Sequence, residues 1–213
     1  MPTADLTCTL LSDGSSDRAL MPILRWSLHC HLPRRPVQLK WADMRQLPRP
    51  PRELHEKIAE SLQLYPCDLL FIHRDTEGGS IDDRRSEIHH ALNLAAPTHP
   101  GVAVIPVRMM EAWLLIQESA IRRAANNPNG RTALAMPRLR EIEDITDPKS
   151  VLHEIIRKAT ELGTHRRDRF DVHYAVHRVA DYIEDFSPLR QLSAFRVLEE
   201  QITTTITGRG WVA

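Results

Sequence analysis

Cysteine, glycine and aromatic residues are all scarce in this chain of 213 residues. The three cysteines, Cys8, Cys30 and Cys67, form an odd and widely spaced set, which favours reduced thiols over a disulfide scaffold. No apolar run reaches the roughly 18 residues that a membrane helix needs. Residues 1–5 do not form the basic start of a secretory leader. We therefore expect a soluble cytoplasmic protein with no membrane partner.

Net charge is absent as well, because 28 Lys and Arg balance 28 Asp and Glu. The chain has no global field to hold nucleic acid, so any such binding must come from local clusters. Two basic segments are candidates, one around Arg34 and Arg35 and one around Arg166 and Arg167. Their side chains would contact phosphates without reading bases. Solvated surface charge is the alternative interpretation.

Several enzyme motifs are missing. No Gly-x-x-x-x-Gly-Lys-Ser/Thr loop occurs, so any ATP-driven step would belong to a partner. No Gly-x-Ser-x-Gly element is present to carry a serine nucleophile. The triplet at residues 73–75 matches the start of a kinase catalytic loop, but Ser80 stands where that loop needs Asn.

What the chain does contain is an alternation of short apolar runs and helical patterns. The runs at 6–11, 37–41, 68–72 and 101–107 predict strands. Helical spacing predicts helices from about Ser16, where Ser15 or Ser16 is the expected N-cap, and over 52–64, 81–94 and 109–120. This order predicts an α/β fold with a mostly parallel central sheet and helices on both faces.

After residue 120 the strand signals stop. Helical patterns follow over about 134–142, 151–162, 169–183 and 188–206. We therefore expect an α/β core over residues 1–120 and a helical C-terminal region over 121–213 packed on that core.

Acidic residues directly follow two of the predicted strands. Asp13 and Asp17 come after the first, and Asp75 and Glu77 come after the third. Carboxyl ends of neighbouring parallel strands are where an α/β sheet builds its sites. Clustered carboxylates recruit hard cations, so Mg²⁺ or Mn²⁺ is the expected cofactor and a phosphodiester the expected substrate. Ordinary turn and helix-cap roles are the alternative for each carboxylate taken singly.

Glu111 follows the fourth predicted strand and could turn a further carboxylate into the same cleft. A glutamate on a helix surface is the alternative. Arg108, close by, could hold a phosphate or balance the acidic cluster.

The order of these segments resembles the TOPRIM-like proteins of bacterial defence loci, small proteins encoded beside an ATPase. The resemblance covers about residues 5–118 and lies in Asp13-Gly14-Ser15-Ser16-Asp17, in His73-Arg74-Asp75-Thr76-Glu77, and in the segment from Val107 to Leu115. It aligns Asp13 with the family's first acidic position, which is usually Glu. It aligns Asp75 and Glu77 with the acidic pair that binds Mg²⁺ for strand cleavage or joining.

The resemblance implies a Mg²⁺-dependent nuclease or nuclease-like effector acting on DNA or RNA in antiviral defence, with an ATPase partner. Asp13, Asp75, Glu77 and Glu111 would be catalytic, with Asp13, Asp75 and Glu77 holding the Mg²⁺ and Glu111 or Asp17 assisting. The hydroxide of a metal-bound water could be the general base, and His73 is a weaker candidate for that role. The alternative is a catalytically silent TOPRIM-like scaffold whose helical tail is a docking surface.

Overall fold

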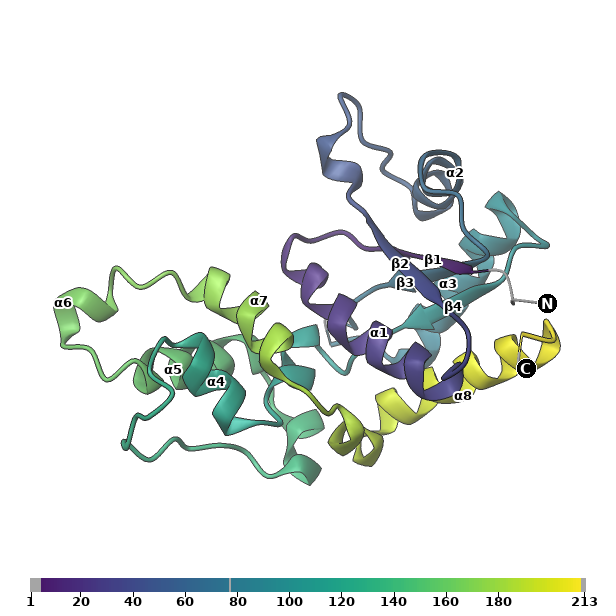
Figure 1. The fold of residues 1–213 in the computed structure, drawn as a ribbon. Coiled ribbons are helices and arrows are strands. Elements are labelled where there is room, and N and C mark those ends of the chain that lie inside the picture. Colours follow the sequence, from purple (N-terminus) through teal and green to yellow (C-terminus); the bar gives the residue numbers. More distant parts are fainter. Residues whose placement is uncertain (1–4, 77, 212–213) are drawn as a thin grey trace.

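Within residues 5–76 and 78–211, which the computed structural model describes, four strands form one parallel sheet (Figure 1). They are β1 (Leu6–Leu11), β2 (Val37–Ala42), β3 (Leu69–His73) and β4 (Gly101–Val104). Their order across the sheet is β2-β1-β3-β4. The chain therefore moves to one side of β1 to form β2 and to the other side to form β3 and β4. The carboxyl ends of β1 and β3 flank the resulting switch point, where open α/β sheets bind ligands.

Side chains alternate between the two faces of the sheet, as the period of a strand requires. Leu10 and Phe71 pack with helices α1 (Leu20–His31) and α8 (Ser193–Gly208) on one face. Leu70 and Ile72 pack with α2 (Leu54–Leu64) and α3 (Ile81–Ala95) on the other. Both faces are covered, so the predicted fold class, an α/β parallel sheet with helices on both faces, is confirmed.

The connecting helices begin at recognisable caps. Glu53 and Glu56 form a capping box at the start of α2, and the Ser80 side chain accepts from the backbone N–H of Asp83 in α3. The predicted cap at Ser15 or Ser16 makes no side-chain capping bond at the 3-10 helix η1 (Ser16–Ala19), which leads into α1. In its place, the Asp17 carboxylate accepts from the backbone of Gly14.

Several predicted elements differ from the structure. The strand predicted over 101–107 ends at Val104, and the helix predicted over 188–206 is divided into a 3-10 helix over 187–191 and α8. Residues 109–120 form a 3-10 helix, η3 (Met110–Leu114), followed by α4 (Glu118–Ala124). Every residue of η3 is buried. The pattern at 134–142 yields only the 3-10 helix η4 (Leu139–Asp144), since Pro137 disrupts a continuous helix.

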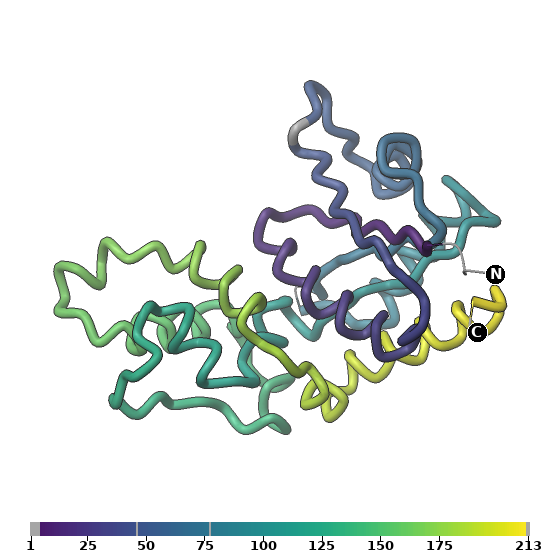
Figure 2. Tube along the Cα trace, viewed as in Figure 1, coloured from purple at the N-terminus to yellow at the C-terminus, as the bar shows by residue number. Residues whose placement is uncertain are grey.

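The helical appendage is built from η3, η4, α4, α5 (Pro148–Ala159), α6 (Thr164–Arg167) and α7 (Val172–Tyr182). It projects from the sheet to one side, as the tube in Figure 2 shows. The chain then passes through η5 (Ser187–Gln191) and returns along the sheet as α8, which contacts β4 and α1. The last helix thus belongs to the sheet layer. No helix in the described part of the chain has the length and apolar character to cross a membrane.

Candidate active site at the carboxyl ends of the strands

A pocket of about 320 Å³ opens at the switch point between β1 and β3. The loop after β1 lines it with residues that include Asp13 and Asp17, and the end of β3 contributes His73 and Asp75. The predicted convergence of Asp13, Asp17 and Asp75 on one pocket therefore has a simple cause: parallel strands in register end at the same edge. Glu77 lies outside the described residues.

Asp17 is buried at the start of η1, with 7 % of its surface exposed. Its Oδ2 accepts from the backbone N–H of Gly14 over 2.6 Å, and its Oδ1 accepts from Ser16 Oγ over 3.3 Å. A Cβ atom on Gly14 would stand 3.1 Å from both carboxylate oxygens. Gly14, which has no side chain, thus lets the loop close tightly around Asp17.

His73, the last residue of β3, is buried beside this carboxylate. Its Nδ1 lies 2.9 Å from the carbonyl oxygen of Val104, which can only accept, so Nδ1 carries the hydrogen. Its Nε2 lies 3.4 Å from Asp75 Oδ1 and 3.9 Å from Asp17 Oδ1. The imidazole is therefore positioned between carboxylates from two neighbouring strands.

Glu111 is also buried, with 4 % of its surface exposed in η3. Burial raises the pKa of Glu111, and the charges of Asp75 and Asp17 raise it further against the opposing effects of its own backbone N–H and Lys149. Glu111 is therefore close enough to the two aspartates for their charges to act on it. The alternative of a glutamate on the helix surface is wrong, because the side chain is in the interior.

Asp13 lies at the exposed side of the pocket and makes different contacts. Its Oδ1 accepts from Lys57 Nζ over 2.5 Å and its Oδ2 from an Arg74 terminal nitrogen over 2.7 Å. Burial alone would raise the pKa of Asp13, but the bonds and charges of Lys57 and Arg74 together lower it below its usual value. Two cations thus occupy the carboxylate that the TOPRIM resemblance assigns to the metal.

The oxygen-rich set of Asp17, Asp75 and Glu111 has the donor chemistry that Mg²⁺ and Mn²⁺ prefer. The three carboxylates and His73 are hereafter called the acidic cluster. In the part of the chain that the structure describes, no group of three or more His, Cys, Asp or Glu side chains is already arranged to hold a metal ion. Binding a cation at the acidic cluster would therefore require these side chains to close inward.

The predicted arginines fall in three separate places. Arg108 has a left-handed backbone with a φ of 62°, and its N–H donates to the Thr76 hydroxyl over 2.7 Å, which ties it to the loop that carries Asp75. Arg34 and Arg35 precede β2, at the opposite edge of the sheet from the acidic cluster. The last two, Arg166 and Arg167, lie in α6 on the distant part of the appendage (Figure 1).

The local sequence does not indicate that two further basic residues belong to this pocket. Lys57 comes from α2, 44 positions from its partner Asp13. Arg84 comes from α3, where its Nε donates to the Asp75 carbonyl over 3.0 Å. Both sit on surface-like helical positions, so only the packing of α2 and α3 on the sheet brings them to the pocket.

No family model, curated protein or solved structure matches this chain. The TOPRIM resemblance therefore stays a prediction that rests on the residues quoted for it.

Proposed function

We propose that this protein is a divalent-metal-dependent hydrolase of nucleic-acid phosphodiesters, with Asp17, Asp75 and Glu111 as the metal ligands. The observation that carries the proposal is the approach of Asp17 and Asp75 to the buried His73 at the switch point of the sheet, with a further buried carboxylate, Glu111, within reach of their charges. Like charges held close together and away from water are unfavourable unless a cation offsets them. His73 supplies at most one positive charge, so a divalent ion would supply the positive charge that the carboxylates still need.

A bound Mg²⁺ would polarise a phosphate oxygen and lower the pKa of a coordinated water. The protein's own residues would do the rest. The hydrogen bond from His73 to Val104 fixes the imidazole, which leaves Nε2 facing the acidic cluster to accept or return a proton. Lys57 and Arg74 lie at the exposed side of the pocket. There a phosphate of the substrate would replace the Asp13 carboxylate as their partner.

The resemblance adds a setting to this proposal: defence against phage or foreign DNA beside an ATPase partner. The chain's lack of a phosphate-binding loop of its own is compatible with such a division of labour.

A non-catalytic binding subunit is the second candidate, and a specific observation favours it. The ion pairs of Asp13 with Lys57 and Arg74 neutralise the position that the resemblance makes catalytic. In that case the sheet would be a scaffold, and the helical appendage would carry the docking surface.

The test combines metal binding with cleavage. Mn²⁺ binding is measured by electron paramagnetic resonance on the wild type, Glu111→Gln and Asp75→Ala, with the exposed Glu184→Gln as the matched control. Plasmid DNA and RNA are then incubated with each protein in Mg²⁺ or Mn²⁺, alone and with any ATPase encoded nearby. We expect binding and cleavage in the wild type and the control and their loss in the other two variants. Cleavage that survives Asp75→Ala, or no Mn²⁺ binding by the wild type, would overturn the hydrolase proposal.

A further inference from the structure

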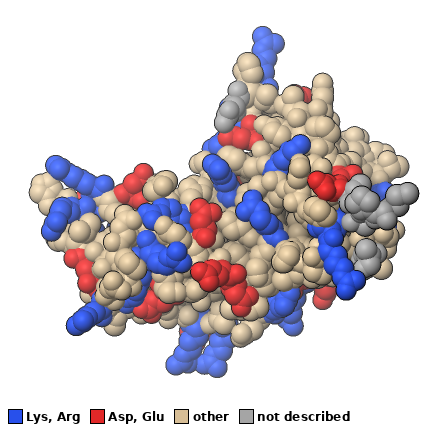
Figure 3. Space-filling model, in the orientation of Figure 1, with Lys and Arg blue, Asp and Glu red and all other residues tan. Residues whose placement is uncertain are grey.

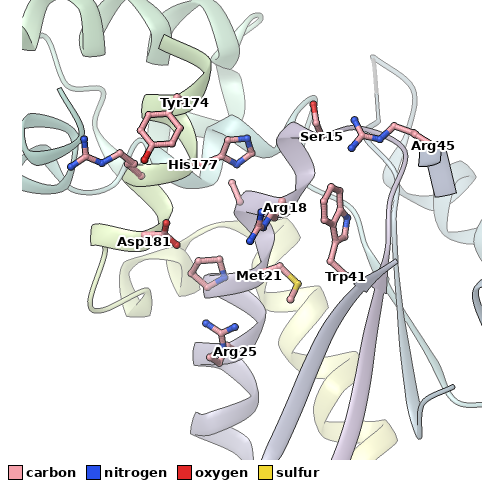
Figure 4. A pocket seen from close by; sticks show the side chains of 12 residues that line it. Ser15, Arg18, Met21, Arg25, Trp41, Arg45, Tyr174, His177 and Asp181 are labelled. Carbon is pink, nitrogen blue, oxygen red and sulfur yellow. The ribbon is translucent and has the colours of Figure 1, made fainter. Parts of the chain in front are cut away.

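A second and larger hollow, of about 620 Å³, lies between the α/β core and the appendage. One wall is the end of β2 with Trp41 and Arg45, and the opposite wall is α7 with Tyr174 and His177 (Figure 4). Arg18, from the start of the α1 segment, lies between the two walls. We call this hollow the interlobe groove. Its volume is in the range of ordinary ligand sites.

The interlobe groove carries an excess of positive charge although the chain as a whole is neutral. Four arginines line it, Arg18, Arg25, Arg45 and Arg178, against one acidic residue, Asp181. Among the described residues, no carboxylate lies within ion-pair distance of the exposed side chains of Arg18 and Arg25. Lys and Arg side chains border the hollow between core and appendage on the face shown in Figure 3. A groove of this charge favours a polyanion.

Arg178 is held in place by neutral partners. It donates to Asn126 Oδ1 over 2.6 Å and to the hydroxyl of Tyr182, and its guanidinium lies 5.0 Å from the Tyr182 ring centroid. None of these contacts cancels its charge. Both terminal nitrogens of Arg178 are thus engaged within the appendage, and its charge adds to the field of the groove.

Each wall also presents an aromatic ring with an arginine over it. Arg45 lies 5.5 Å from the Trp41 ring centroid, and Arg178 lies 5.9 Å from that of Tyr174. The indole of Trp41 is oriented by its hydrogen bond to Ser12 over 3.0 Å. Tyr174 is 62 % exposed, which is unusual for a large apolar ring in a protein with few aromatic residues. Because Arg45 is paired with Asp43, its contribution is a stacking surface rather than free charge.

The interlobe groove and the acidic pocket share a single loop. Ser15 lines the groove, while its neighbours Gly14 and Ser16 line the pocket that contains the acidic cluster. A ligand lying along the groove and extending past this loop would reach the acidic cluster directly.

We propose that the interlobe groove binds single-stranded nucleic acid, with Arg18 and Arg25 on the phosphates and with Trp41 and Tyr174 stacking on unpaired bases. The strand would be led over Ser15 into the acidic pocket. Basic side chains that follow the backbone and aromatic rings that accept any base are how proteins bind single strands without reading sequence. This inference deepens the function proposed above and rests on it for the identity of the phosphodiester substrate.

Binding is tested with a fluorescent oligothymidylate of about 12 nucleotides, followed by anisotropy in EDTA so that no cleavage can occur. The Arg18→Ala/Arg25→Ala double variant should bind at least about tenfold more weakly, and its salt dependence should fall by about 0.7 in log–log slope for each phosphate that is no longer neutralised. Tyr174→Ala should weaken binding about fivefold or more, and Tyr174→Phe should restore it. Thermal unfolding confirms that each variant is folded.

The charge-matched control is Arg140→Ala/Arg196→Ala, which removes two exposed arginines outside the groove and should bind like the wild type. The inference is overturned if the wild type does not bind the oligomer, if the two double variants bind equally, or if duplex DNA or a free mononucleotide competes as well as the single strand.

The outcomes for the groove and for the acidic cluster are separable. Loss of binding in the groove variants without metal-dependent cleavage by the wild type would support the groove and reject the hydrolase. Metal-dependent cleavage that is equally fast in the groove variants would support the hydrolase and reject the groove.

Discussion

The indole of Trp113 meets the ring of Phe195 edge to face, with centroids 5.4 Å apart and an angle of 88° between the planes. Trp113 belongs to η3, two residues after Glu111, and Phe195 belongs to α8. Both rings are fully buried. The contact therefore ties the segment that carries a carboxylate of the acidic cluster to the helix that covers the sheet, although the two rings are far apart in the chain.

Replacing Phe195 by alanine should accordingly cost about 3–5 kcal/mol of folding free energy, because it leaves a cavity beside Trp113. Urea denaturation followed by circular dichroism measures the loss. Leu94→Ala, at an exposed apolar position, is the control and should stay within about 0.5 kcal/mol of the wild type. Equal losses in the two variants would contradict the packing described for Phe195.

The Gly14→Ala variant should disturb Asp17 directly. The new Cβ would stand 3.1 Å from both oxygens of the Asp17 carboxylate, so this carboxylate must shift by a few tenths of an ångström. We expect a loss of about 1 kcal/mol in stability and weaker Mn²⁺ binding at the acidic cluster. Gly163→Ala is the matched control, since nothing lies within 4 Å of its added Cβ. Unchanged Mn²⁺ affinity in Gly14→Ala would argue against Asp17 as a ligand.

Glu111 should make the protein less stable as the pH rises. Because burial raises the pKa of Glu111 in the native state, the folded chain holds its proton at pH values where the unfolded chain has lost it. Stability from this group therefore falls from about the ordinary glutamate pKa upward, until the native pKa is passed. Glu111→Gln removes the dependence.

Unfolding free energies of wild type and Glu111→Gln, measured from pH 4 to pH 7 without metal, report this effect. As the pH rises, the free energy of unfolding of Glu111→Gln should increase relative to that of the wild type. Added Mn²⁺ should stabilise only the wild type. A stability difference that does not change with pH would mean that Glu111 is not shielded from water as described.

Lys57→Met should raise the pKa of Asp13 toward its ordinary value of 3.8, since one of the two cations that lower it is removed. The stabilisation from this pair is present above that value and is lost as the pH falls through the lower native pKa. Because the Asp13 side chain is nearly half exposed, the loss at neutral pH should be no more than about 0.5 kcal/mol. An NMR titration of the Asp13 carboxyl group checks the direction.

The sequence by itself determined the α/β class and the edge at which the candidate site lies. Short apolar runs such as 69–72, bounded by turn signals, favour strands covered on both faces, and acidic residues placed directly after two of them share an edge once the strands are parallel. The positions of Asp13, Asp17 and Asp75 around one pocket followed from that placement, because local pattern sets where each strand ends.

Only the tertiary structure decided which carboxylates are close to one another and which are neutralised. Lys57 reaches Asp13 from another helix, and Glu111 enters the interior because η3 is buried on every side. The interlobe groove likewise joins β2 to α7, which are more than 100 residues apart in the chain. Such contacts depend on how helices pack against the sheet, and the periodicity of one segment carries no information about its distant neighbours.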